Sequence, residues 1–214
     1  MFLICPGCGE WSNLRPVVES TIVCECGYRQ PITLRPLLLV TGASGTGKST
    51  IALQLIRLFT EAVVLDQDIL WMPEMDTPED NWARFGSLWL RVVANIAQSG
   101  RPVLLFGSAD PDRYEALPER RYVGPIRTLA LVCNDEELTL RLRTRPAWRN
   151  SAGEGFVSSM LHFNESLRSL AGLRRERVTL LDTSRDRVEA SAAQVVKWAA
   201  PILENEQDLA RLPL

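Results

Sequence analysis

Five short runs of apolar residues recur along the chain, and a polar or glycine-containing turn follows each of them. The runs cover residues 37–41, 62–65, 103–106, 128–133 and 178–181. Apolar runs of this length are typical of strands that are buried on both faces. Between the runs, apolar positions recur every three or four residues, as in Leu88, Val92 and Ile96, which predicts amphipathic helices. Strands that alternate with helices predict a parallel sheet covered by helices.

Capping residues and helix breakers locate some boundaries. Asn134 followed three residues later by Glu137 is a helix-start pattern, and Pro146 is expected to stop the helix that begins there. A terminal helix is predicted after the fifth run, and residues 204–214 are expected to be a frayed tail. We therefore predict a small N-terminal segment, a layered α/β domain and a C-terminal tail, with the bounds 1–35, 36–203 and 204–214.

The first apolar run leads directly into a glycine-rich segment with the pattern G-x-x-x-x-G-K-S, and a helical pattern follows. This strand–loop–helix context is typical of a phosphate-binding loop. Glycines free backbone N–H groups to wrap around phosphate oxygens, and the helix dipole adds to the attraction. Lys48 is expected to reach the β- and γ-phosphates, and the Ser49 hydroxyl to bind Mg²⁺. The candidate nucleotide-binding residues of the loop are Gly42, Ser44, Gly45, Thr46, Gly47, Lys48, Ser49 and Thr50.

Composition supports this interpretation and excludes some classes of protein. The chain has 214 residues and a mass of 24.0 kDa, enough for one compact core with a small appendage. Only Lys48 and Lys197 of the 24 lysines and arginines are lysines, so lysine is kept where a compact charge suits a phosphate. The net charge of −2 gives no general attraction for nucleic acid. No apolar run approaches the ~20 residues that cross a bilayer and no secretory leader is recognisable, so we expect a cytoplasmic protein.

Four of the five cysteines lie near the N-terminus with the spacing C-x2-C-x15-C-x-C, at Cys5, Cys8, Cys24 and Cys26. Four thiolates complete a tetrahedral shell for structural Zn²⁺, and disulfides are the alternative in an oxidising compartment. The first half resembles the knuckle of a zinc ribbon, whereas the second half has one intervening residue in place of two. So short a segment cannot fold on apolar burial alone, so bound zinc would stabilise it. Because this segment has only three cations, a docking or structural role is favoured over binding to nucleic acid.

Two carboxylates follow the second apolar run. On an extended segment Asp66 and Asp68 would point into the same cleft, at the edge where parallel sheets gather their sites. The alternative is that they only cap the turn. The third run ends in Phe106-Gly107 without an aspartate, which argues against motor-type ATPases.

A group of arginines follows the fourth run. Arg141 and Arg145 are four residues apart and share a predicted helix face, and Arg149 precedes a loop of residues 150–155. A solvated basic helix face is the alternative to a functional role.

In its order of parts, the segment 36–203 resembles the P-loop kinases of small molecules, such as shikimate, gluconate, nucleoside and nucleotide kinases. The resemblance implies a three-layer α/β sandwich with a five-stranded parallel sheet of order 2-3-1-4-5, and ATP and Mg²⁺ as cofactors. It implies that Asp66 belongs to the magnesium site and that Asp68 orients or deprotonates the acceptor. It also implies a mobile lid that brings Arg145 and Arg149 to the transferring phosphoryl group. By the same resemblance, the residues beside the nucleotide would include Arg141, Thr183 and Arg185.

Aromatic residues gather between the second and third runs, where these kinases bind their acceptor. Trp82, Phe85 and Trp89 share one face of a predicted helix, a spacing that more often indicates core packing. The alternative is a slot for a planar acceptor such as a nucleobase, with Arg84 or Arg91 for a phosphate or carboxylate. The candidate acceptor-binding residues are Asp68, Trp71, Trp82, Arg84 and Phe85.

These patterns predict an ATP-dependent phosphotransferase that acts on a small molecule, with an N-terminal zinc ribbon that could also bind a protein partner. Two other hypotheses stay open. One is a nucleotide-dependent switch whose ribbon binds a partner, and the other is a kinase that acts on nucleic-acid ends.

Overall fold

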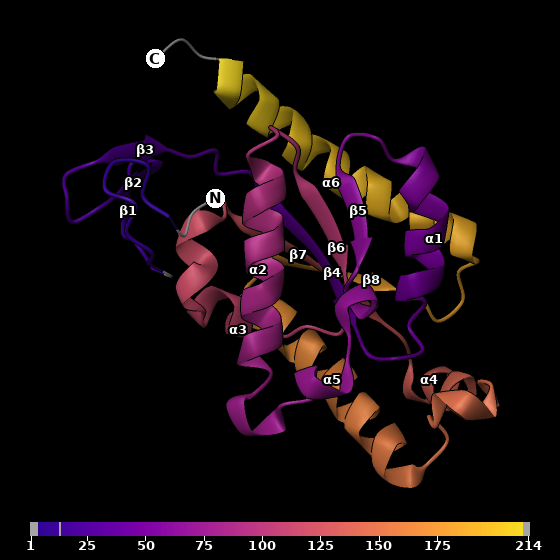
Figure 1. The fold of residues 1–214 in the computed structure, drawn as a ribbon. Helices are drawn as coiled ribbons and strands as arrows, with labels where there is room; N and C mark the ends of the chain where they lie inside the picture. Colours follow the sequence, from indigo (N-terminus) through magenta and orange to yellow (C-terminus); the bar gives the residue numbers. More distant parts are fainter. Residues whose placement is uncertain (1–3, 13, 212–214) are drawn as a thin grey trace.

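A parallel sheet forms the centre of the computed structural model, which describes residues 4–12 and 14–211, with side chains described up to residue 204 (Figure 1). Its five strands are β4 (Leu37–Gly42), β5 (Val63–Asp66), β6 (Val103–Phe106), β7 (Ile126–Val132) and β8 (Val178–Asp182). They lie in the order β5-β6-β4-β7-β8, and each neighbouring pair is parallel. Numbered among themselves along the chain, these strands have the order 2-3-1-4-5, so the predicted topology is confirmed.

Helices cover both faces of the sheet. The α-helices are α1 (Lys48–Leu58), α2 (Ala83–Ala97), α3 (Pro111–Ala116), α4 (Asp135–Thr144), α5 (Glu154–Leu173) and α6 (Val188–Arg211). Short 3-10 helices are η1 (Gln67–Leu70), η2 (Pro73–Met75), η3 (Pro78–Asp80), η4 (Pro118–Tyr122) and η5 (Ala147–Arg149). Helices α1 and α6 share one apolar cluster with the sheet, and α2 and α3 share another. The result is a three-layer sandwich (Figure 1).

The central strand β4 explains how one apolar run supplies two cores. Successive side chains of a strand point to opposite faces of the sheet. Leu38 and Val40 therefore join the cluster with α1 and α6, whereas Leu37 and Leu39 join the cluster with α2 and α3. All four are fully buried, and their run ends where the phosphate loop begins.

The N-terminal segment forms a small unit beside α2 and α3 (Figure 1). Its antiparallel strands are β1 (Val17–Val18), β2 (Thr21–Val23) and β3 (Arg29–Pro31). We call residues 4–32 the ribbon.

The ribbon is docked on the α/β domain. Ile22 and Ile32 are buried in the same apolar cluster as the inner face of α2. Thr33 follows the ribbon directly, and both of its backbone groups bond to the Gln98 side chain at the end of α2. The Thr33 N–H donates to Gln98 at 3.0 Å, and the Gln98 amide donates to the Thr33 carbonyl at 2.9 Å. The ribbon and α2 therefore form one packed body.

The C-terminal helix is longer than predicted. Helix α6 continues to Arg211, so the expected tail is wrong for residues 204–211, and residues 212–214 lie outside the described residues. The reason is local, because no glycine or proline interrupts residues 202–211 and most of them favour helix.

None of the helices in the described part of the chain has the length and apolar character that a membrane-spanning helix requires.

Candidate active site

The phosphate loop joins β4 to α1. Gly45 and Gly47 have φ values of 94° and 95°, a left-handed conformation that side-chain-bearing residues rarely adopt. The Lys48 ammonium folds back over the loop and donates to the carbonyls of Gly42 at 2.6 Å and Ala43 at 2.9 Å. The loop is thus already curved, with its lysine inside the curve.

Further contacts stabilise the curvature. The buried Thr46 hydroxyl donates to the Ala43 carbonyl at 2.9 Å, and the Ser44 N–H lies 3.3 Å from the Met160 sulfur of α5. Ser49 and Thr50 follow Lys48 in the first turn of α1. The eight residues predicted to bind phosphate therefore lie on one strand–loop–helix junction.

The two carboxylates do not lie on an extended segment, so that expectation is wrong. Asp66 ends β5, and its carboxylate accepts a hydrogen bond from the Asp68 N–H at 3.0 Å, which caps the 3-10 helix η1. Because the Asp66 side chain offers this bond, the chain turns at once instead of extending. Both carboxylates nevertheless interact electrostatically with Lys48.

Electrostatic interactions show which charged groups lie together. Burial lowers the pKa of the Lys48 ammonium to about 8, against the opposing effect of the Asp68 and Asp66 carboxylates. Burial and the Asp66 charge raise the pKa of Asp68. The cations Lys48, Arg149 and Arg145 oppose that rise. Five charged groups from the loop, the strand end and the lid thus influence one another.

Arg145 and Arg149, which were predicted to belong to a lid, follow α4. Asn134 caps this helix as predicted, accepting a hydrogen bond from the Glu137 N–H at 2.8 Å. Arg145 ends the helix, and partial burial and the charge of Arg149 lower its pKa. The Arg149 guanidinium lies 4.5 Å from the ring centroid of Trp148, an indole that is 72% exposed. Arg145 is thus partly buried and Arg149 exposed, and both interact electrostatically with Asp68.

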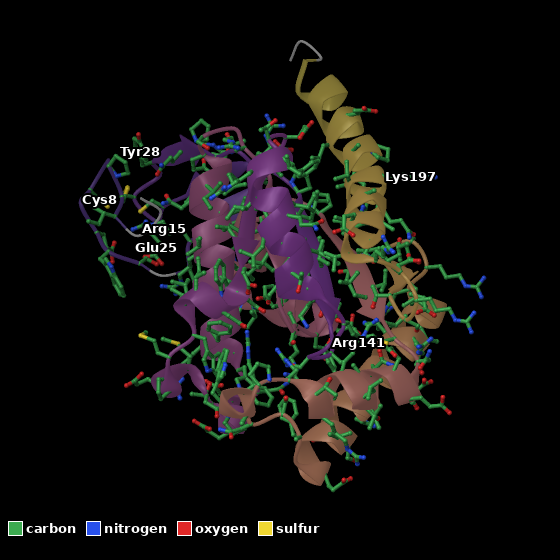
Figure 2. All side chains as sticks on the ribbon, turned by 90° about the vertical axis from the view of Figure 1, so that its right-hand side faces the viewer. Cys8, Arg15, Glu25, Tyr28, Arg141 and Lys197 are labelled. Atoms are coloured by element: carbon green, nitrogen blue, oxygen red, sulfur yellow. The ribbon has the colours of Figure 1, made fainter. Side chains whose placement is uncertain are left out.

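Arg141 has a different environment from these two arginines. Its guanidinium donates to the Glu137 carboxylate at 2.7 Å and the Thr183 carbonyl at 2.8 Å, and it reaches the Gly45 carbonyl at 3.5 Å. Figure 2 shows it far from the ribbon residue Cys8. Arg141 therefore links the phosphate loop to the loop that follows β8.

The loop after β8 lies beside the phosphate loop. The buried Thr183 hydroxyl donates to the carbonyls of Thr46 at 3.1 Å and Val132 at 3.2 Å, so it is used within the fold. Arg185 lines a hollow of about 320 Å³, whose other lining residues are Asn134, Asp182, Ser184 and Asp186.

The aromatic residues divide into two groups. Trp71, which is 44% exposed, packs edge-on against Phe85 with ring centroids 5.2 Å apart, and Phe85 in turn contacts Trp89 at 6.4 Å. Phe85 and Trp89 are buried, so the core interpretation describes both of them. Trp71, by contrast, stays half exposed.

Trp82 packs against the same apolar cluster as Phe85 and Trp89, but it is the N-cap of α2 and does not lie on a regular turn of the helix as predicted. It precedes α2 with a φ of 55°, and its indole N–H donates to the Asp76 carboxylate at 3.1 Å. Its ring lies under the Arg113 guanidinium at 5.2 Å. The helix starts one residue later than the spacing assumed, so Trp82 lies outside its regular turns.

The arginines expected near the acceptor already have carboxylate partners. Arg84 pairs with Asp80 at 2.8 Å and Glu79 at 3.2 Å. Arg91 pairs with the buried Glu119 at 2.7 Å. Neither guanidinium is left without a carboxylate partner.

Sequence reasoning missed polar residues that connect the strand ends. The Ser108 hydroxyl donates to the Gly42 carbonyl at 3.1 Å, and the Thr41 hydroxyl donates to the Ala109 carbonyl at 2.6 Å. Gln67, between the two aspartates, is buried. The only signal for them was a polar residue at the end of an apolar run.

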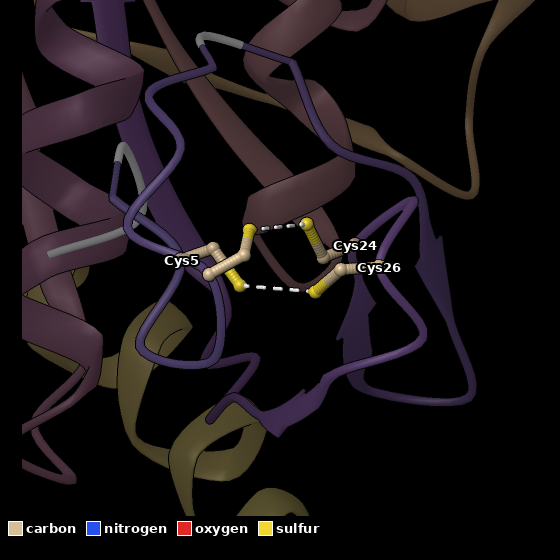
Figure 3. A group of neighbouring side chains, drawn as sticks. Cys5, Cys24 and Cys26 are labelled. Carbon is tan, nitrogen blue, oxygen red and sulfur yellow. Dashed lines mark hydrogen bonds between the residues drawn. The ribbon is translucent and has the colours of Figure 1, made fainter.

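The four N-terminal cysteines form one cluster, with all sulfurs within 4.8 Å of one another (Figure 3). The Cys5 and Cys26 sulfurs are 3.7 Å apart, and those of Cys8 and Cys24 are 3.8 Å apart. A tetrahedral site with Zn–S bonds of about 2.3 Å places its sulfurs about 3.8 Å apart. All five cysteines of the chain are free of disulfides. The cluster therefore has the geometry of a four-cysteine zinc site in a ribbon.

Several solved kinase structures resemble this chain. A sugar kinase from Janibacter sp. HTCC2649 is 21% identical, with a TM-score of 0.54, and the match covers 78% of this chain and 95% of that one. A gluconokinase from Sinorhizobium meliloti 1021 is 16% identical, with a TM-score of 0.57 and coverages of 84% and 99%. A shikimate kinase from Acinetobacter baumannii, solved with shikimate, is 18% identical, with a TM-score of 0.52 and coverages of 79% and 94%.

No protein-family model and no curated protein matches the chain. The structural matches cover nearly the whole of each kinase and about four-fifths of this chain. At these identities the likeness concerns the fold, and the predicted resemblance is confirmed at that level: the chain has the fold of the P-loop kinases of small molecules, preceded by a ribbon with four clustered cysteines.

Proposed function

We propose that this protein is an ATP-dependent phosphotransferase that moves the γ-phosphoryl group to a hydroxyl or phosphate group of a small molecule. The observation that carries the proposal is that five charged side chains from three parts of the chain interact electrostatically at the phosphate loop. These are Lys48, Asp66, Asp68, Arg145 and Arg149. The sugar kinase, gluconokinase and shikimate kinase structures support the same reaction class.

The phosphate loop would hold the nucleotide. Its backbone N–H groups and the start of α1 provide positive potential for the phosphates, and Lys48 would exchange its bonds to two loop carbonyls for bonds to phosphate oxygens. Ser49 and Asp66 offer oxygen ligands for Mg²⁺, which when bound neutralises phosphate charge. Arg141 of α4, together with Thr183 and Arg185 of the loop after β8, would lie beside the nucleotide.

Asp68 would act on the acceptor. Its carboxylate accepts the proton of the acceptor hydroxyl as that oxygen forms a bond to the γ-phosphorus and the bond to the β–γ bridging oxygen breaks. The products are ADP and a phosphate ester. Arg145 and Arg149 would stabilise the charge on the equatorial oxygens and exclude water when the lid closes.

Trp71 supports an acceptor with a flat apolar part, such as a nucleoside or nucleotide. Trp71 is the C-cap of η1, and its N–H donates to the Asp68 carbonyl at 3.1 Å, so the two residues are joined across one short turn. The ring is half exposed and its edge is fixed by Phe85. The paired Arg84 and the packed Trp82 make weaker candidates.

The ribbon would hold one structural Zn²⁺ through Cys5, Cys8, Cys24 and Cys26. Its exposed apolar side chains, such as Trp11 at 59%, support a further role in docking a protein partner.

The test is a screen of nucleosides, nucleotides and small hydroxylated metabolites for ADP production that depends on the acceptor. With a positive acceptor, Asp68→Asn should lower kcat by about a hundredfold or more. Asp135→Asn, which changes an exposed carboxylate on α4, is the matched control and should leave kcat unchanged. ADP production at the same rate without any acceptor would favour a nucleotide switch, and full activity of Asp68→Asn would remove Asp68 from its role.

A further inference from the structure

Gln67 lies between the two site carboxylates and points the other way. It is 4% exposed, and its side-chain amide donates to the hydroxyl of Tyr114 on α3. Tyr114 is equally buried, at 4%. A buried amide and a buried phenol thus satisfy each other directly behind the carboxylates.

Gly107 shows how tightly the Gln67 side chain is fitted. A Cβ at this glycine would lie 1.8 Å from Gln67 Oε1 and 2.7 Å from Gln67 Cβ. No side chain fits at position 107 while Gln67 keeps this place. The Gln67 side chain therefore lies across the end of β6.

The same strand end is bonded to the phosphate loop on its other side. Immediately after Gly107, Ser108 donates to the Gly42 carbonyl at 3.1 Å. The Ala109 backbone both donates to the Thr41 hydroxyl at 3.1 Å and accepts from it at 2.6 Å. A chain of contacts thus runs from Tyr114 through its hydrogen bond to Gln67, through the packing of Gln67 against Gly107, to the hydrogen bonds that join Ser108 and Ala109 to the end of β4.

We propose that Gln67 and Tyr114 are positioning residues that fix the direction of the Asp68 carboxylate relative to Lys48. Successive residues of a 3-10 helix are rotated by about 120°, so a fixed side chain at Gln67 fixes where Asp68 points. A carboxylate that must meet an acceptor hydroxyl needs this constraint, because small displacements cost large factors in rate. This inference rests on the proposed phosphotransferase function and adds the device that orients its base.

The experiment compares three variants. Tyr114→Phe removes the phenol acceptor, Gln67→Met removes the amide at similar length, and Gly107→Ala displaces the Gln67 side chain. With an acceptor found in the screen, each should lower kcat about tenfold while the KM for ATP stays within about twofold. The double variant of Gln67 and Tyr114 should lose no more than either single variant, because both remove the same bond.

Tyr122→Phe is the matched control, because Tyr122 is another buried tyrosine, with its hydroxyl bonded to the Arg15 carbonyl at 2.9 Å. It should lower thermal stability about as much as Tyr114→Phe and leave kcat unchanged. If Tyr114→Phe and Gln67→Met keep the full kcat, or if Tyr122→Phe loses as much kcat as they do, the positioning role is wrong.

A second measurement does not depend on activity. Crystal structures of the wild type and Tyr114→Phe should differ in the separation of the Asp68 carboxylate from Lys48 Nζ. An unchanged separation overturns the inference even where phosphotransfer is confirmed. If the separation changes but the protein phosphorylates no acceptor, the positioning role of Gln67 and Tyr114 is supported and the proposed function is wrong.

Discussion

The strand β4 is buried along its whole length in the α/β domain, whereas the ribbon strands have only two or three residues each. Many apolar side chains of the ribbon are exposed, among them Ile4, Trp11 and Tyr28. Its four cysteines cluster instead around a point where a metal fits. The α/β domain is therefore held by apolar burial, and the ribbon by its thiolates and by the few side chains that enter the neighbouring core.

Because of this difference, the residues that stabilise the α/β domain are not its reactive residues, whereas in the ribbon they are the same. In the α/β domain, apolar burial holds the strands, so charged groups at the strand ends are available for reaction. In the ribbon, the cysteines that could react are the groups that hold the fold. We therefore expect variants of the two regions to fail in different ways.

The largest effect is expected from the phosphate loop. Lys48→Met should reduce phosphoryl transfer about a thousandfold, because it removes the charge that stabilises the transferring group. The protein should stay folded with its ribbon intact, since the lysine lies in the loop and not in the apolar core.

Lys197→Met is the matched control, because Lys197 is the other lysine of the chain and lies exposed on α6, away from Arg141 (Figure 2). It should keep full activity. Equal loss in both variants, measured in the acceptor-dependent ADP assay, would show that the phosphate loop is not the reaction centre.

The second-largest effect is expected from removal of zinc, which should unfold the ribbon and leave the α/β domain folded. A chelator, or Cys24→Ser, should unfold residues 4–32 and leave the five-stranded sheet intact, because the metal supplies much of the folding energy of so small a unit. Hydrogen exchange should show protection lost in β1–β3 and kept in β4 and β6. Cys133→Ser, which changes the buried cysteine after β7, is the contrast and should leave the ribbon protected. Loss of protection throughout the chain on chelation would contradict the comparison.

The shared core tests how far the regions are independent. Ile22→Ala should cost about 2–5 kcal/mol of unfolding free energy, because this ribbon side chain is buried against α2. Ile56→Ala on α1, where the side chain is 57% exposed, should cost well under about 1 kcal/mol. Denaturant titration measures both, and a cost at Ile22 as small as that at Ile56 would mean that the ribbon does not pack on the core.

A smaller effect is expected from pH. Burial lowers the pKa of Lys48 to about 8, and bound phosphates favour its charged form, so nucleotide binding above pH 8 must take up a proton. The affinity should fall about five- to sixfold between pH 8 and pH 9, and by less than about twofold between pH 7 and pH 8. Calorimetry at pH 9 in two buffers of different ionisation enthalpy measures the proton uptake, which Lys48→Met should abolish and Lys197→Met should retain. Equal heats in both buffers would contradict the role given to Lys48.

The features that could be predicted from the sequence are those that depend on residues close together in the chain. The glycines and lysine of the loop, the apolar runs of the sheet and the spacing of the cysteines each depend on local chemistry. Asn134 is a similar case, because a cap acts within one turn.

Features that depend on distant partners could not be predicted. The bond between Gln67 and Tyr114 spans 47 positions, and no local pattern announces it. From the sequence, Arg91 could have bound a ligand, but in the structure it pairs with Glu119, which is 28 residues away in the chain. Asp66 illustrates another reason. After this residue the chain could either continue as a strand or turn, and the hydrogen bond from the Asp68 N–H to the Asp66 carboxylate stabilises the turn.

The most direct test follows the γ-phosphorus itself. Phosphorus NMR of the protein with ATP, Mg²⁺ and an acceptor from the screen should show the γ resonance replaced by that of a phosphate ester, with little inorganic phosphate. Formation of inorganic phosphate at one rate with and without every acceptor would contradict a kinase and identify a hydrolase on the same fold.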